Sequence, residues 1–378
     1  MSARRAFWLL VAGIAVIAFA IWLSSRRHLE RDLAAGELVL PGLEQQVNAL
    51  TSVSLRRGDD THTTLRKDAH GWQVAERDWP ADLSKVRKLV LGLGALNIVE
   101  EKTRLPANYP QLGVEDVASP KAGGTLIELT APAHRWALIV GKSSGAKSGY
   151  VRIAGTPPSL LAAPQLSVDA DPKVWLAHEL LDISEQRVRE IEEQPAQGAS
   201  YKAARDKAKD ANFNVSPLPK GRALSSPGAA DGLGAALSTL TLDDVRKAAP
   251  PAGAAPGQPA GAALAQPAGA APAQQAGAAL AHATFRTFDG LEVELAGRKD
   301  GPHALVTINA RSNAPVTAAE AQTLSARLSG WEFEIPDYKY GLIFTPLEDL
   351  LAKPAAPATN PKDTPAKGHA AAAPLPSR

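Results

Sequence analysis

The stretch SVSLRRGDDTHTTLRKDAHGWQVA, residues 52–75, decides the fold class of this chain. It contains three short segments, 52–57, 61–67 and 71–75, in which apolar and polar side chains alternate, and two polar turns separate them. Alternation with a period of two is typical of half-buried strands, and this close spacing is typical of an antiparallel meander. We therefore predict a β-sheet at this point of the chain.

A helix is predicted directly after the meander. Asp82 follows Pro80-Ala81 and is a residue type favoured at helix N-caps. Four apolar residues then recur at i, i+3, i+4 and i+7, which places them on one helix face: Val86, Leu89, Val90 and Leu93. Further strands are predicted over 97–102, 125–130, 135–140 and 149–154. Residues 40–183 are thus predicted to form an α+β module.

Residues 184–352 repeat this order of elements in a second predicted α+β module. Segment 188–192 corresponds to 53–57, and the apolar segment 233–240, predicted to be a helix, stands where 86–93 stood. Because a repeat identifies the folding unit, we predict two repeated antiparallel-sheet-plus-helix modules that pack as pseudo-symmetric halves. The later strands of the second module are predicted over 284–288, 291–295 and 304–308.

Two segments of low complexity are predicted to be disordered. Residues 248–282 form an Ala/Gly/Pro/Gln linker inside the second module, with no charged side chain and a recurring octapeptide whose Gly and Pro interrupt helix formation. The tail, 353–378, consists mainly of Ala, Pro, Lys and Gly. Between them, Thr317-Ala318-Ala319-Glu320 predicts a capping box that opens a helix through Leu328, and Thr345-Pro346 predicts another helix start.

The N-terminal segment, 1–32, is predicted to be a transmembrane anchor with its flanks. Residues 6–23 form an uncharged apolar run, and a helix that crosses roughly 30 Å of hydrocarbon needs about 20 such residues. Two arginines precede the run and three follow it, so the positive-inside rule alone does not fix the orientation. The short basic head favours a signal-anchor that leaves the bulk of the chain in the periplasm. Two alternatives stay open, namely cleavage after Ala18-Phe19-Ala20 and a cytoplasmic body.

Composition excludes two classes of function. The chain has no cysteine, so disulfides and thiol chemistry are excluded. The first 32 residues carry five Arg against Glu30 and Asp32, a balance of +3, so the remainder of the chain sums to −1 out of a net +2. That remainder has no basic surplus from which to build a nucleic-acid footprint.

The best match to a catalytic motif is Gly141-Lys142-Ser143-Ser144-Gly145, which fits G-x-S-x-G. A nucleophile elbow requires a helix after the strand. A second strand is predicted there instead, so the segment is interpreted as a hairpin loop. We predict no catalytic residue and expect that the protein is not an enzyme.

Two further patterns could bind a ligand. Asp169 and Asp171 could share a divalent cation, but two carboxylates before a proline are typical of a turn or helix start. Four tryptophans could stack on a sugar, but their apolar neighbours favour core packing: Trp72, Trp136, Trp175 and Trp331. No metal site and no cofactor are therefore predicted.

Taken together, these elements resemble a bacterial family known as domain of unknown function 4340. The match rests on the anchor and on motifs at 71–74 (GWQV), 109–113 (YPQLG), 138–141 (LIVG) with 150–152 (YVR), 171–183 and 330–340. The resemblance implies a membrane-anchored, exported protein with a repeated α+β module, no assigned activity and no catalytic residues to carry over. It also implies a genomic setting beside components similar to ABC-type transport systems of gliding motility.

We therefore expect a non-enzymatic accessory or scaffold of a cell-envelope complex in the bacterial inner membrane, a single-pass protein with most of its chain in the periplasm. Its expected partners are the cytoplasmic membrane and other membrane proteins, ABC-type transporter components among them, and no nucleic acid. Two alternatives stay open. One is a periplasmic protein that binds a glycan or peptide, and the other is a serine hydrolase that uses Ser143.

Overall fold

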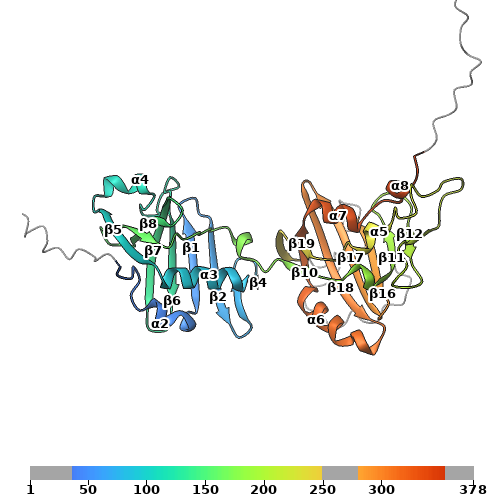
Figure 1. The fold of residues 1–378 in the computed structure, drawn as a ribbon, viewed down its shortest axis with the longest axis horizontal. Helices are drawn as coiled ribbons and strands as arrows, with labels where there is room; N and C mark the ends of the chain where they lie inside the picture. The colour runs from blue at the N-terminus through green and yellow to red at the C-terminus, as the bar shows by residue number, and fades with distance from the viewer. Residues whose placement is uncertain (1–35, 249–279, 354–378) are drawn as a thin grey trace, which may run out of the picture. The chain divides into compact units, whose positions relative to one another are not determined.

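The computed structural model describes residues 36–248 and 280–353 (Figure 1). The chain divides into two compact units, and each is described by itself. The first unit runs up to Glu179 and includes Thr241–Lys247, whereas the second contains Leu180–Leu240 and the chain from Ala248 onward. Within the described ranges no helix combines the length and the apolar character that a membrane span requires. The predicted anchor over 1–32 lies outside these ranges, as do most of the predicted linker and tail.

A large antiparallel sheet forms the body of the first unit (Figure 1), with strand order β4-β3-β2-β1-β6-β7-β8-β9-β5. Val53 lies opposite Leu65 on one neighbouring strand and Leu129 on the other, so the apolar residues of adjacent strands share one buried face. The strands are β1 (Ser52–Arg57), β2 (His62–Asp68), β3 (Gly71–Val74), β4 (Trp79–Pro80), β5 (Asn97–Thr103), β6 (Thr125–Thr130), β7 (Arg135–Ser144), β8 (Ser148–Ile153) and β9 (Ser159–Ala163).

One amphipathic helix, α3 (Leu83–Gly94), is the longest helix of the first unit and forms where the sequence predicts it. Its predicted stripe is buried: Val86, Leu89, Val90 and Leu93. The remaining helices are single turns, namely α2 (Leu43–Gln46), η1 (Val47–Ala49), η2 (Pro106–Asn108), α4 (Tyr109–Leu112) and η3 (Pro172–Trp175).

The second unit is built on another antiparallel sheet, in which the strands that belong to this unit follow the order β13-β12-β11-β16-β17-β18-β19. Ile191 in β11 lies between Ala203 and Phe285, and all three side chains are buried. Its strands are β11 (Val188–Gln194), β12 (Tyr201–Ala204), β13 (Asn214–Ser216), β16 (Ala281–Thr287), β17 (Leu291–Asp300), β18 (His303–Ser312) and β19 (Trp331–Ile335). β10 (Glu179–Leu181) pairs with β14 (Leu240–Thr241), and β15 (Asp244–Lys247) belongs to the first unit.

The helices of the second unit are also short. They are η4 (Glu185–Arg187), α5 (Asp231–Gly234), η5 (Pro315–Thr317), α6 (Ala318–Leu328), α7 (Asp337–Ile343) and α8 (Leu347–Leu350). The fold is therefore made mostly of two large antiparallel sheets with a few short helices, which confirms the coarser part of the predicted α+β class.

The two sheets share an order of strands. In the first, β3-β2-β1 is followed by β6-β7-β8-β9, and in the second, β13-β12-β11 is followed by β16-β17-β18-β19. In each sheet, three strands that are consecutive in sequence lie side by side. The later strands continue the sheet from the free edge of the first of them, β1 in one sheet and β11 in the other. The chain makes this return after α3 and β5 in the first unit and after α5 and β14 in the second.

The helix predicted over 233–240 is wrong. Only α5 forms there, and the chain turns before β14 begins at Leu240. Two glycines within four residues weaken the helix, and Gly234 is held against Phe213, since a Cβ at this glycine would lie 2.9 Å from the Phe213 ring. Thr239 adopts a positive φ of 47°, which a helix does not allow.

The two predicted helix caps are wrong in detail, although both helices exist. The Thr317 side chain bonds to Ser312 Oγ at 2.7 Å and makes no cap to α6. Glu320, the other member of the predicted capping box, binds an arginine instead. Thr345 Oγ1 donates to Gly341 O at 2.9 Å, and Pro346 is the N-cap of α8 rather than its first helical residue. Other hydrogen-bond partners, four or five residues earlier in the chain, thus bind the two threonine hydroxyls in place of the predicted caps.

Candidate functional site

Helix α3 is set in place by Asp82. Its carboxylate accepts hydrogen bonds from the backbone N–H groups of Ser84 and Lys85 at 2.9 and 3.2 Å, and from Ser84 Oγ at 2.5 Å. Partial burial opposes ionisation of this carboxyl, but the hydrogen bonds outweigh burial, so the pKa of Asp82 lies below its ordinary value. The N-cap predicted from the sequence is therefore confirmed.

A pocket of about 410 Å³ opens beside α3, in the first unit. The helix forms one wall, residues 164–169 form a second, and η3 forms the third. Trp175 is 4% exposed, and its indole Nε1 donates to Asp169 O at 2.8 Å, which fixes the ring against the loop. The apolar part of the lining comes from Leu89, Gly92, Pro164, Leu166, Val174 and Trp175.

Polar groups line the same pocket on the side of Lys85 and Lys88. Lys85 Nζ donates to Val174 O at 2.7 Å and lies 3.8 Å from the Asp82 carboxylate. Lys88 is exposed and makes no ion pair within the part of the chain that the structure describes. Asp169 uses one carboxylate oxygen to accept the backbone N–H of Asp171 at 2.9 Å. Lys88 therefore carries a positive charge without a counter-ion at the pocket.

The dimensions and lining of this α3 pocket suit a small ligand or the side chains of a bound segment. Ligand pockets span about 300–1,000 Å³ and combine an apolar lining with a few placed polar groups. The α3 pocket meets both criteria. Its polar groups are two ammonium groups, a carboxylate, an amide and a hydroxyl, which can orient a ligand by charge and hydrogen bonding.

Because Asp82 anchors the start of α3, we expect Asp82→Ala to lower the free energy of unfolding of the first unit by about 1 kcal/mol. Asp82→Asn is the matched control, since asparagine keeps an acceptor oxygen and should lose only a few tenths of that amount. Urea unfolding followed by circular dichroism measures both variants. Equal losses in the two variants would mean that charge, rather than capping, is what stabilises the helix start.

The G-x-S-x-G segment forms no nucleophile elbow. Ser143 lies near the end of β7 and is paired with Gly149 of β8, and the chain between the strands is a turn at 145–147. The predicted hairpin is therefore confirmed.

The aspartates and tryptophans also fall into structural roles. Asp171 caps η3 by accepting the backbone N–H of Lys173 at 2.9 Å, as predicted for a helix start. In the described residues no group of three or more His, Cys, Asp or Glu is placed to hold a metal ion. Trp175 is buried as predicted, whereas Trp72, Trp136 and Trp331 are partly exposed.

Three of the motifs that carry the family resemblance, 109–113, 138–141 and 150–152, come together in the first unit. Tyr109 packs with Val114 and Ile139, and the guanidinium of Arg152 lies 4.7 Å from the centre of the Tyr109 ring. At Gly141 a Cβ would lie 2.4 Å from Leu112 O, so no other residue fits there. The YPQLG, LIVG and YVR motifs are thus parts of one packed cluster, and their role here is structural.

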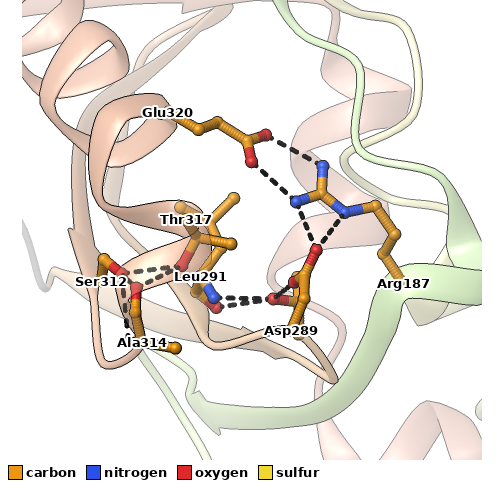
Figure 2. A network of polar contacts seen from close by, with 8 residues as sticks. Arg187, Asp289, Leu291, Ser312, Ala314, Thr317 and Glu320 are labelled. Carbon is orange, nitrogen blue, oxygen red and sulfur yellow. Dashed lines mark hydrogen bonds and ion pairs between the residues drawn. The ribbon is translucent and has the colours of Figure 1, made fainter.

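A second polar cluster ties elements of the second unit together (Figure 2). Arg187 donates to Asp289 Oδ2 at 2.9 Å and to Glu320 Oε2 at 2.8 Å, with further bonds to the same two carboxylates. The hydrogen bonds to Glu320 make the largest contribution and hold the pKa of the Arg187 guanidinium above its ordinary value. Partial burial lowers this pKa, and the bonds to Asp289 raise it further. Because two carboxylates occupy its donors, Arg187 acts as a clamp between η4, the β16–β17 turn and α6.

We expect Arg187→Met to lower the free energy of unfolding of the second unit by about 1–2 kcal/mol, because each carboxylate loses a charged hydrogen-bond partner at a site that water partly screens. Arg189→Met, a neighbouring exposed arginine, is the control and should change stability by less than about 0.5 kcal/mol. Denaturant unfolding at low and high salt checks the result. Equal losses in both variants would contradict the clamp.

The α3 pocket was not predicted from the sequence. A partial signal exists, since Lys85, Lys88 and Gly92 recur at i, i+3 and i+7 and therefore share a helix face beside the buried stripe. A glycine on that face marks a place where another segment approaches. The opposing wall at 164–169 has no periodicity, so the sequence alone does not bring it to the helix.

Comparison with known proteins supports one family. No curated protein and no solved structure matches the chain. The DUF4340 family, described as "Domain of unknown function", matches residues 72–259, about half of the chain. This range begins in β3 of the first unit and contains α3, the α3 pocket and the Tyr109 cluster. Residues 72–259 therefore form a DUF4340 domain, a domain of unknown function.

Proposed function

We propose that this protein is a membrane-anchored, non-enzymatic accessory of a cell-envelope complex, and that it binds a partner protein through the α3 pocket. The observation that carries the proposal is the pocket itself, with a largely apolar lining, a volume of about 410 Å³ and a lysine, Lys88, that makes no ion pair with any residue the structure describes. Such a lining can bind and orient a side chain of a partner. The DUF4340 family description assigns no activity, so the proposal rests on this geometry.

The setting of this function is part of the same proposal. The apolar run at 6–23 anchors the chain in the bacterial inner membrane, and the rest of the chain lies in the periplasm. The two sheets are copies of one module, a reading that their common strand order supports. The partner is a membrane protein, and components of an ABC-type transporter are the first candidates, as the family resemblance suggests.

Site-specific photo-crosslinking of the full-length protein in its native membrane tests the proposal. A photoreactive amino acid replaces Lys88 or Leu166 in the pocket, and Lys67, exposed on β2, is the matched control position. We expect the two pocket positions to crosslink to the same transporter subunit and the control position not to do so. Crosslinks to lipid or to the protein itself only, or equal crosslinks from all three positions, would overturn the proposal.

The size of the pocket also favours a second function, the binding of a free periplasmic peptide or glycan. A pocket of this volume is large enough for a ligand that belongs to no partner protein. The two functions differ in the crosslinking experiment, because a free ligand leaves no protein adduct at Lys88 or Leu166. Mass spectrometry of the adducts then distinguishes a partner protein from a free peptide or glycan.

A further inference from the structure

The two ends of the α3 pocket differ in character. Lys85 and Lys88 lie toward the start of α3, and Gly92 lies toward its end. Seven residues of helix separate Lys85 from Gly92, which corresponds to about 10 Å. A ligand that runs along the helix therefore meets ammonium groups at one end and apolar side chains at the other.

The apolar end of the pocket is lined by Leu89, Gly92 and Leu166, and the missing side chain at residue 92 lets Leu166 approach the helix closely. A Cβ placed at Gly92 would lie 3.0 Å from Cδ2 of Leu166 on the opposing wall. Gly92 is helical, where glycine costs about 0.5–1 kcal/mol relative to alanine. The pocket volume of about 410 Å³ that remains along this apolar lining is large enough for a branched apolar side chain from another molecule.

The lining holds two ammonium groups, Lys85 and Lys88, against one carboxylate, Asp169, so its net charge is positive and favours an anion. Lys85 already donates to Val174 O and lies near Asp82, so its charge is partly compensated. Lys88 has no such partner among the residues described. An incoming carboxylate would meet both ammonium groups, with Lys88 supplying the charge that no internal group neutralises.

Apolar surface continues beyond the pocket on the same helix. Leu91 is 53% exposed and lies three residues after Lys88, so it adjoins the pocket on the surface of α3. A molecule that fills the pocket and also covers Leu91 must extend past the cavity. An extended peptide does so, whereas a compact amphiphile that fits within the cavity does not.

We propose that the α3 pocket binds an extended peptide segment in which a branched apolar residue is followed, two positions later, by a carboxylate, because alternate side chains of an extended segment share one face. The apolar side chain lies beside Gly92, and the carboxylate pairs with Lys88 and Lys85. This inference deepens the proposed function and rests on it, because it specifies the chemistry of the partner segment that the pocket accepts.

Fluorescence anisotropy of the full-length protein in nanodiscs tests the inference. The probe is a fluorescein-labelled pool of pentapeptides with Leu at the second position, Glu at the fourth and apolar residues elsewhere, and the matched pool carries Gln in place of Glu. We expect the Glu pool to bind at least about fivefold more tightly, as one ion pair of about 1 kcal/mol requires. Equal binding of the two pools would overturn the inference. An anisotropy that added protein leaves unchanged in both pools would also overturn it.

Variants locate the binding. Gly92→Leu places a side chain in the apolar end and should weaken binding at least about tenfold, whereas Gly92→Ala should change it far less. Lys88→Glu should abolish the preference for the Glu pool, and Arg87→Glu, on the same helix outside the pocket, should leave it intact. Circular dichroism confirms that each variant is folded. Unchanged binding in folded Gly92→Leu protein would place the peptide elsewhere and overturn the proposal.

Competition with dodecanoate separates a lipid-derived carboxylate from a peptide. Tight dodecanoate binding that depends on Gly92, together with weak peptide binding, would overturn the peptide proposal. Failure of this inference differs from failure of the proposed function. If pocket positions crosslink to a partner subunit but the Glu pool shows no preference, only the acidic chemistry is wrong. If the pool binds but no crosslinks to a partner form, the accessory function is wrong.

Discussion

Replacing Glu193 by glutamine is expected to raise the free energy of unfolding of the second unit at pH 7.5 by about 2–4 kcal/mol. Glu193 lies in β11 with 0% of its surface exposed, between Tyr201 of β12 and Ala283 of β16. Neither carboxylate oxygen has a hydrogen-bond partner among the described residues. Loss of solvation on burial raises the pKa of Glu193 to about 10, against an ordinary value of 4.5.

The direction of the pH dependence follows from these two values. The folded state keeps the proton of Glu193 up to about pH 10, whereas the unfolded chain releases it near pH 4.5. Between these two pH values the folded state binds more protons at Glu193, so the contribution of Glu193 to stability is most favourable below pH 4.5 and falls as the pH rises. The slope is about 1.4 kcal/mol per pH unit, so the cost is about 4 kcal/mol at pH 7.5 before structural relaxation reduces it.

Urea unfolding of wild-type and Glu193→Gln protein at pH 5, 6.5 and 8 measures this effect. The gap between the two proteins should widen with each step, because glutamine has no proton to release. Glu192→Gln is the control, since Glu192 lies next in sequence but is ion-paired with Arg286 at 3.0 Å. A constant gap for Glu193→Gln across the three pH values would show that the carboxyl is hydrated in the folded state.

Replacing Arg152 by methionine is expected to lower the free energy of unfolding of the first unit by about 3–5 kcal/mol. Arg152 is 3% exposed, and its guanidinium donates to Val114 O at 2.7 Å and to Thr156 O at 3.2 Å. It also lies over the Tyr109 ring and bonds to Asp116. Methionine fills part of the volume but leaves buried carbonyl groups without donors, which is the main cost.

Arg152→Lys is the informative control. Lysine keeps the charge, but a single ammonium group cannot reach the acceptors that the planar fork of arginine binds together. We therefore expect Arg152→Lys to lose at least half as much stability as Arg152→Met. Thermal unfolding of both variants measures the difference, and full rescue by lysine would mean that charge alone matters. The Asp116 partner contributes little, because its side chain is 74% exposed.

Local patterns predicted most of the secondary structure. The alternation at 52–75 gave β1, β2 and β3, and the stripe of Val86, Leu89, Val90 and Leu93 gave α3 with its Asp82 cap. These predictions succeed because period-two and helical patterns arise from residues that are neighbours in sequence. They fail where another contact, from a distant residue or from a different nearby group, competes with the predicted one. At 233–240 the packing of Gly234 on Phe213 replaces a helix with one turn, and at Thr317 the Ser312 hydroxyl replaces a cap.

The sequence by itself determined the antiparallel β-rich class, the position of α3, the hairpin at Ser143 and the absence of cysteine chemistry. Tertiary structure alone decided the α3 pocket, the position of Arg152 in the Tyr109 cluster and the burial of Glu193. The physical reason is separation along the chain. The pocket forms only because residues 164–175 lie beside a helix that precedes them by about 80 residues. In the sequence Glu193 resembles an ordinary surface residue, and it is buried only because Tyr201 and Ala283 lie on the two neighbouring strands. A local pattern records neither approach, because both depend on how the sheet orders its strands.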